Sequence, residues 1–275
     1  AENFPVGSWL MPARIRPAVL AIYRFARHAD DIADEGDAPA DVRDQGLLAL
    51  DAALHVARGG QPSGEPVVDG LIEPSARFGL DWQYFHDLLD AFRQDLRVRR
   101  YEDDAAVLDY CRRSANPVGR LMLQLFDADT PLNRQHSDAI CSALQRINFL
   151  QDIGIDADKD RVYLPQEVLR AAGVDDVQLL REARSGQLGE RCRAAVRENW
   201  RVVRRQLLSG CSLPRRLPGR LSAELRFIIS GGHRILDRIA AADYDSVARR
   251  PKLGWADAPA LLHRAIRLPR EDEPV

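Results

Sequence analysis

The chain has 275 residues, of which 45% are hydrophobic and 29% are charged, a balance typical of a globular protein large enough to bury a substantial core. Its formal net charge of −2 at pH 7 excludes a strongly basic character, so we expect no nucleic-acid partner. No apolar stretch reaches the ~20 residues of a membrane-spanning helix, and the first residues lack the pattern of a signal peptide. We therefore expect a cytoplasmic protein.

Apolar residues recur at helical spacing along nearly the whole chain. The predicted helices cover residues of about 14–35, 41–58, 66–78, 81–97, 104–126, 131–152, 174–209 and 218–242. In the first of them, one buried face is predicted from Val19, Ile22, Phe25, Ala26, Ala29 and Ala33. No run of alternating β-branched residues indicates a strand. We predict an all-α protein in which residues 1–275 form a single helical-bundle domain.

The four cysteines are widely spaced, at Cys111, Cys141, Cys192 and Cys211. They form neither a Cys-x-x-Cys pair nor a Cys/His pairing, so the sequence predicts no structural zinc site. Because most of them fall inside predicted helices, we expect reduced thiols in the core.

Two carboxylate clusters lie about 120 residues apart, and in each the polar residues recur at intervals of three or four, the spacing of a helix. Asp30 and Asp34 are four residues apart, with Asp31 beside them, so they project from one side of a helix. The second cluster runs at offsets of three, four and four through Gln145, Asn148, Asp152 and Asp156. Like charges at this spacing destabilise an isolated helix, and oxygen-only ligands suit Mg²⁺.

Either cluster alone is more often a solvated helix face. Two of them on core-type helices favour a cation between them. If the clusters face each other across a helical bundle, Mg²⁺ at one end of a cavity can hold a diphosphate and stabilise it as a leaving group. The apolar remainder of such a cavity suits a long hydrocarbon, and the combination indicates ionisation of an allylic diphosphate.

Three motifs together resemble the squalene/phytoene synthase family over about residues 3–255. They are Tyr23-x-x-x-Arg27-x-x-Asp30-Asp31-x-x-Asp34, Tyr110-Cys111-x-x-x-Ala115-x-x-Val118-Gly119, and Gln145-x-x-Asn148-x-x-x-Asp152-x-x-x-Asp156 running on into Asp160-Arg161-Val162-Tyr163-Leu164-Pro165. The resemblance implies the fold of the class I isoprenoid synthases, with a central cavity. It leaves a charged tail at about residues 264–275.

The resemblance also implies roles for individual residues. The Mg²⁺ ligands, with Mn²⁺ as a substitute ion, would be Asp30, Asp31, Asp34, Asn148, Asp152 and Asp156. The residues that bind diphosphate or other parts of the substrate would be Phe4, Arg27, Gln145, Arg161 and Arg250. The residues that line the reaction centre, where their π faces can stabilise carbocations, would be Tyr23, Tyr110 and Tyr163. Core packing is the alternative role for each tyrosine.

Small residues at Ala115, Val118 and Gly119 would let the hydrocarbon pass close to a helix, and tight helix packing is the alternative. Asn116 and His233 are candidates for orienting a water molecule. His233 replaces a tyrosine common in the family, and a hydrogen-bonded structural role is its alternative. Pro117 lies inside a predicted helix, which we expect to be kinked there.

The opening Asn3-Phe4-Pro5-Val6 and the segment Ser114-Ala115-Asn116-Pro117-Val118-Gly119 resemble one bacterial branch of the family, the hydroxysqualene synthases of hopanoid biosynthesis. This resemblance implies Mg²⁺-dependent conversion of presqualene diphosphate and water to hydroxysqualene and diphosphate, through ionisation, carbocation rearrangement and water capture. The reaction needs no hydride, so no NADPH is expected.

Two alternatives stay open at this point. The first is head-to-head condensation of two prenyl diphosphates such as farnesyl diphosphate, by a presqualene diphosphate, phytoene-type or reductive squalene synthase. The second, of another class, is a helical assembly factor without catalysis. A prenyl diphosphate is the expected partner, and a C30 lipid substrate is consistent with peripheral contact at the inner membrane face. It is also consistent with a functional link to the preceding and following enzymes of squalene biosynthesis.

Overall fold

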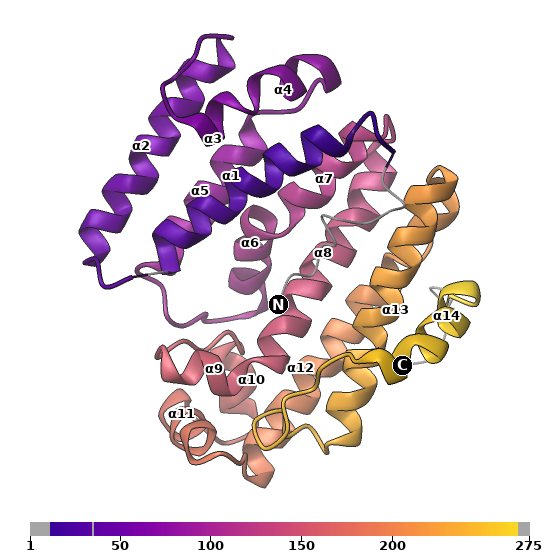
Figure 1. Cartoon of the computed structure of the whole chain (residues 1–275). Coiled ribbons are helices and arrows are strands. Elements are labelled where there is room, and N and C mark those ends of the chain that lie inside the picture. Colours follow the sequence, from indigo (N-terminus) through magenta and orange to yellow (C-terminus); the bar gives the residue numbers. More distant parts are fainter. Residues whose placement is uncertain (1–11, 35, 269–275) are drawn as a thin grey trace. The chain divides into compact units, whose positions relative to one another are not determined.

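The computed structural model describes residues 12–34 and 36–268 (Figure 1). Helices make up almost all of the regular structure in these ranges, where an isolated parallel bridge between Arg100 and Val162 is the β-pairing observed. The prediction of an all-α protein is confirmed. Within the described residues, no helix combines the length and the apolar character needed to cross a membrane.

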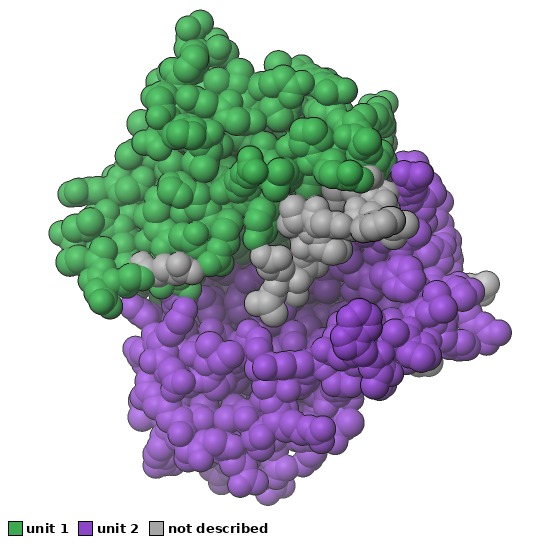
Figure 2. Space-filling view, in the orientation of Figure 1, with its two compact units in different colours: residues 1–98, 112–134 green, residues 99–111, 135–275 purple. Residues whose placement is uncertain are grey.

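The chain divides into two compact units, which Figure 2 shows in different colours. Unit 1 contains residues 1–98 and 112–134, and unit 2 contains residues 99–111 and 135–275. The prediction that residues 1–275 form a single domain stays a prediction.

Unit 1 is built around its first helix. Its helices are α1 (Arg16–Asp34), α2 (Ala40–Arg58), α3 (Pro66–Asp69), α4 (Ile72–Phe78), α5 (Gln83–Asp95) and α7 (Asn116–Leu125). Helix α1 packs against α2, α3, α4 and α5, and Phe25 meets Phe85 of α5 edge to face with ring centroids 5.4 Å apart. The face of α1 predicted to be apolar is buried, apart from Ala26, which is partly exposed. Its polar side chains therefore point away from the unit 1 core.

Unit 2 contains most of the remaining helices. They are α8 (Pro131–Gln151), α9 (Ile153–Asp158), α10 (Gln166–Ala171), α11 (Asp176–Ser185), α12 (Glu190–Ser209), α13 (Gly219–Ala241), α14 (Ala258–Ile266), and the 3₁₀ turns η1 (Leu213–Arg216) and η2 (Trp255–Asp257). Helix α13 packs against α12 and α14. A Cβ atom at Gly232 would lie 2.9 Å from Leu144 Cδ2 and 3.2 Å from Leu207 Cδ2, so glycine permits the close approach of α13 to α8 and α12.

Several predicted helices are in fact pairs of helices. The predicted helix over 104–126 is α6 (Asp104–Ser114) followed by α7, with the break at Ala115. Pro117 lies in the first turn of α7, where its missing N–H is harmless, so the proline begins a new helix instead of kinking one. The predicted helix over 174–209 is interrupted because Gly186, at φ 89°, ends α11 in the left-handed conformation. Helices α10 and α14 were not predicted.

All four cysteines are free, as predicted, and Cys111, Cys192 and Cys211 are buried. Burial raises the pKa of the Cys111 thiol to about 12, so this thiol stays protonated and unreactive at neutral pH.

Candidate functional site

The first carboxylate cluster lies at the C-terminal end of α1. Asp30 and Asp31 are partly exposed and Asp34, the last residue of the helix, is exposed. Carboxylates at this end of a helix oppose its dipole, at a cost of about 0.3–1 kcal/mol each. Arg27 offsets part of this cost, since its guanidinium lies 3.0 Å from Asp30 Oδ2 and 2.7 Å from Asp31 Oδ1. The cluster therefore stays unfavourable for its own helix, and the expectation that it binds a cation stays a prediction.

The second carboxylate cluster spans the junction of α8 and α9. The predicted helix over 131–152 is confirmed as α8, but the helical spacing through Asp156 does not run along one unbroken helix, because Asp152 leaves the helical conformation at φ −106° and ψ 15°. The backbone hydrogen bonds nevertheless continue, from Asp152 N to Asn148 O at 2.9 Å and from Asp156 N to Asp152 O at 2.8 Å. The spacing of about one turn between the three side chains is therefore kept. Gln145 lies one turn before Asn148 and is partly exposed.

Arg250 makes a two-pronged ion pair with Asp152. The Nε–Oδ1 distance is 2.5 Å and the NH2–Oδ2 distance is 3.1 Å. Arg250 also lines a pocket of about 340 Å³ with three further basic residues, Arg238, Arg249 and Lys252. Arg250 is paired with Asp152 and Arg238 with Asp257, so Arg249 and Lys252 add the positive charge that favours an anionic ligand such as a phosphate group.

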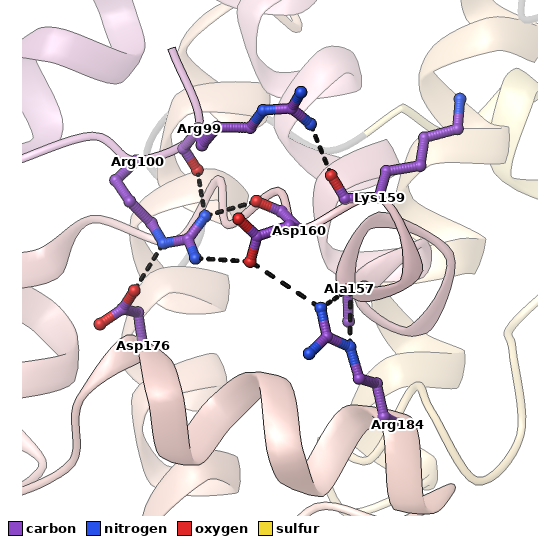
Figure 3. A network of polar contacts seen from close by, with 7 residues as sticks. All are labelled: Arg99, Arg100, Ala157, Lys159, Asp160, Asp176 and Arg184. Atoms are coloured by element: carbon purple, nitrogen blue, oxygen red, sulfur yellow. Dashed lines mark hydrogen bonds and ion pairs between the residues drawn. The ribbon is translucent and has the colours of Figure 1, made fainter. Parts of the chain in front are cut away.

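Figure 3 shows a polar network at the end of α9 that involves Arg99, Arg100, Ala157, Lys159, Asp160, Asp176 and Arg184. Arg100 is its centre, with ion pairs to Asp160 Oδ1 at 3.0 Å and to Asp176 Oδ2 at 2.6 Å. The hydrogen bond from Arg100 lowers the pKa of the Asp160 carboxyl below its usual value. Asp160 adopts a left-handed φ of 56°, which turns the chain so that the Arg161 amide donates to Asp156 O at 2.8 Å. The network therefore fixes Arg161 beside Asp156.

Asp156, Arg161 and Tyr163 line one small pocket together with Phe149. Three of these four residues were predicted to belong to the site. The pocket places a carboxylate and a guanidinium next to two aromatic rings.

Three buried aromatic side chains form a cluster around Tyr163, which is itself buried. Tyr163 stacks on Phe149 with ring centroids 3.8 Å apart and an interplanar angle of 1°, and Tyr101 stacks on its ring at 5.6 Å. Tyr110 lies 6.0 Å from Tyr163 and 5.6 Å from Tyr101. The structure thus brings the predicted Tyr110 and Tyr163 together, and it adds two rings that the sequence analysis missed. Phe149 follows Asn148 directly in the second cluster, a signal that could have revealed it.

His233 lies on α13 and is buried, with its Nε2 atom 3.8 Å from Cys211 Sγ. Burial lowers the pKa of His233 to about 4, so its imidazole is neutral at neutral pH. At the start of α7, Asn116 and Gly119 are buried, whereas Ala115 and Val118 are partly exposed.

The candidate residues are distributed over both units. Unit 1 holds Tyr23, Arg27, Asp30, Asp31, Asp34, Ala115, Asn116, Val118 and Gly119. Unit 2 holds Tyr110, Gln145, Asn148, Asp152, Asp156, Arg161, Tyr163, His233 and Arg250. Phe4 lies outside the described residues. That the two carboxylate clusters face each other stays a prediction.

Comparison with known proteins gives a match over most of the chain. A family model described as squalene/phytoene synthase matches residues 1–257. A hydroxysqualene synthase of Rhodopseudomonas palustris is 44% identical over 181 residues, which are 65% of this chain and 60% of that protein. A hydroxysqualene synthase of Zymomonas mobilis is 42% identical over 178 residues, which are 62% of this chain and 57% of that protein.

A presqualene diphosphate synthase of Zymomonas mobilis is also similar, at 37% identity over 63% of this chain and 60% of that protein. The alignments therefore span about 57 to 60% of the length of these curated relatives. Among solved structures, squalene synthase HpnC from Alicyclobacillus acidocaldarius matches with a TM-score of 0.81 and 32% identity, over 89% of this chain and 90% of that chain.

Proposed function

Because this chain belongs to the squalene/phytoene synthase family, we propose that it converts presqualene diphosphate and water into hydroxysqualene and diphosphate. The observation that carries the proposal is the identity of 42 to 44% to two relatives named hydroxysqualene synthase. The fold supports it, since the match to squalene synthase HpnC extends over 89% of the chain.

The two carboxylate clusters suit Mg²⁺, because they offer carboxylate and amide oxygens that are partly or fully exposed. We propose that these clusters hold Mg²⁺ ions through Asp30, Asp31, Asp34, Asn148, Asp152 and Asp156, and that Mn²⁺ can replace Mg²⁺. Bound Mg²⁺ would neutralise charge on the diphosphate and make it a better leaving group. Arg27, Arg161 and Arg250 donate hydrogen bonds to the same group, and Arg250 does so from a pocket already rich in positive charge.

The aromatic cluster supports the carbocation chemistry. When the C–O bond breaks, its electron pair leaves with the diphosphate and a cyclopropylcarbinyl cation remains. Tyr110, Tyr163 and Phe149 belong to this cluster, and an electron-rich ring face that no neighbouring ring covers can stabilise such a cation without reacting with it. Tyr23 of α1 and the small residues Ala115, Val118 and Gly119 are proposed to line the hydrocarbon path, with Phe4 and Gln145 as further substrate contacts.

After rearrangement to the 1′-1 linked allylic cation, the oxygen of a water molecule attacks it, and the protonated alcohol that forms loses its proton to the released diphosphate or to solvent. The neutral imidazole of His233 can accept a hydrogen bond from water, and the amide of Asn116 can orient one. We therefore propose both as water-positioning residues. No hydride enters the product, so the reaction consumes no NADPH.

The test is product analysis of the purified protein with Mg²⁺, with presqualene diphosphate in one reaction and farnesyl diphosphate in another, each with and without NADPH. We expect hydroxysqualene from presqualene diphosphate alone, at the same rate with and without NADPH. Presqualene diphosphate made from farnesyl diphosphate would instead support the second candidate, which the 37% identity to a presqualene diphosphate synthase favours. Squalene that forms only with NADPH would contradict both, and so would the absence of any turnover.

A further inference from the structure

Two helices of unit 1 bring together an aspartate and two histidines that have no part in the proposed reaction. Asp51 and His55 lie one turn apart on α2, and His86 comes from α5, which packs against α2. The Nδ1 atom of His86 lies 2.6 Å from Asp51 Oδ1, and the Nε2 atom of His55 lies 3.7 Å from Asp51 Oδ2. The two imidazole rings are 4.6 Å apart.

These donors are close enough to share one metal ion. Each residue offers one ligand atom, and the three atoms lie within 4.8 Å of one another. Bonds of 2.0–2.1 Å to a tetrahedral zinc ion separate its ligands by about 3.3 Å, so adjustments of roughly 1 Å complete the site. His55 can make them, because its side chain is 66% exposed.

The rest of the cluster is pre-organised. The side chain of His86 is only 12% exposed, and its hydrogen bond to Asp51 fixes the orientation of the ring. Its Nδ1 atom already lies 2.6 Å from the Asp51 carboxylate, so this is the ring nitrogen that would bind an ion shared with Asp51, in place of the present hydrogen bond.

We propose that Asp51, His55 and His86 bind one Zn²⁺ ion, with water in the remaining coordination position. Two imidazoles and one carboxylate select zinc and similar transition metals over Mg²⁺, which prefers oxygen ligands alone. The site therefore differs in chemistry from the two carboxylate clusters and does not depend on the proposed reaction. The sequence does not reveal this site, because His55 and His86 lie on different helices and form no zinc-ligand motif with each other.

A bound ion links α2 to α5 and stabilises the folded state by mass action. If one of the three ligand residues is removed, the remaining two bind Zn²⁺ only weakly. His55→Ala is the decisive variant, because this side chain is exposed and its loss leaves the core intact. Asp51→Asn is the second variant, since it keeps the shape of the side chain but weakens it as a ligand.

The experiment is a zinc titration of the metal-free full chain by calorimetry, in excess Mg²⁺ so that the carboxylate clusters are occupied. We expect one Zn²⁺ per chain for the unaltered protein, at least tenfold weaker binding for His55→Ala and Asp51→Asn, and no change for His263→Ala, an exposed histidine on α14. With Co²⁺ as the probe, the visible absorption of a tetrahedral site should appear in the unaltered protein and be lost in His55→Ala. Equal zinc affinity of the unaltered protein and His55→Ala would overturn the proposal.

Discussion

The two carboxylate clusters have similar spacing but are held in different ways. On α1, three carboxylates follow one continuous helix, and Arg27 from the same helix pairs with two of them. At the α8–α9 junction, Asp152 is held by Arg250, which lies 98 residues further along the chain. The turn after Asp156 is held by Arg100. The first cluster is therefore positioned by local structure, and the second by contacts between distant segments.

The largest effects are expected where either cluster loses a carboxylate. Asp30→Asn and Asp152→Asn should each slow release of diphosphate by at least about a hundredfold, because the metal and the leaving group lose a charged ligand. Diphosphate release with Mg²⁺ and presqualene diphosphate measures the effect. The matched control is Asp158→Asn, an exposed carboxylate on α9 that has no proposed role. Wild-type turnover in both cluster variants would refute their assignment to Mg²⁺.

Asp30→Asn and Asp152→Asn should also differ in their effect on the stability of the folded protein, because the two clusters are held in different ways. Asp30→Asn leaves Arg27 paired with Asp31, and it removes a like charge from a crowded helix end, so the folded protein should lose no stability. Asp152→Asn leaves Arg250 without its ion-pair partner, so the urea midpoint should fall. Equal midpoints for the two variants would show that the second cluster does not depend on its distant partner.

Substitution of Arg100, the centre of the network in Figure 3, tests whether contacts between distant segments stabilise the second carboxylate cluster. Arg100→Leu leaves the Asp160 and Asp176 carboxylates without this partner and releases the turn that precedes Arg161. We expect the urea midpoint to fall by more than in the control below, together with reduced activity. Urea unfolding and the rate of diphosphate release measure the two effects. Arg170→Leu is the control, because Arg170 makes an exposed ion pair with Glu102 in the same unit. A loss no larger than in this control would contradict the role given to the network.

The free energy of unfolding should depend on pH through the protonation of His233, a buried residue of unit 2. Its pKa is lowered from 6.5 to about 4 by burial, so the unfolded chain binds the proton more tightly than the folded chain does. Stability is therefore unaffected above pH 6.5 and falls as the pH drops from 6.5 towards 4, by about 2 kcal/mol at pH 5. Thermal unfolding between pH 7 and pH 5 measures this, and His233→Leu should lose that part of the slope. An identical slope in the variant would mean that other groups cause the acid sensitivity.

The difference between the clusters also explains what the sequence could predict. The buried face of α1 and the spacing of Asp30 and Asp34 follow from helical periodicity alone, and both were predicted. The ion pair that holds Asp152 was not, because its partner Arg250 lies 98 residues further along the chain. Tyr101 was missed because it lies between helices, beside a bridge that joins Arg100 to Val162. Periodicity carries no information on such contacts.

The smallest effect should come from the arginine of the first cluster. Arg27 is 47% exposed on its side chain and forms ion pairs with Asp30 and Asp31 of its own helix, so Arg27→Gln should cost about 0.5 kcal/mol of stability or less. Arg250 is 29% exposed and holds Asp152 through two bonds from a distant segment, so Arg250→Gln should cost about 1–2 kcal/mol. Both variants should lose activity, because both side chains are proposed to contact diphosphate. Urea midpoints of the two variants side by side decide the point: if they fall equally, the distinction between a locally held and a distantly held cluster is wrong.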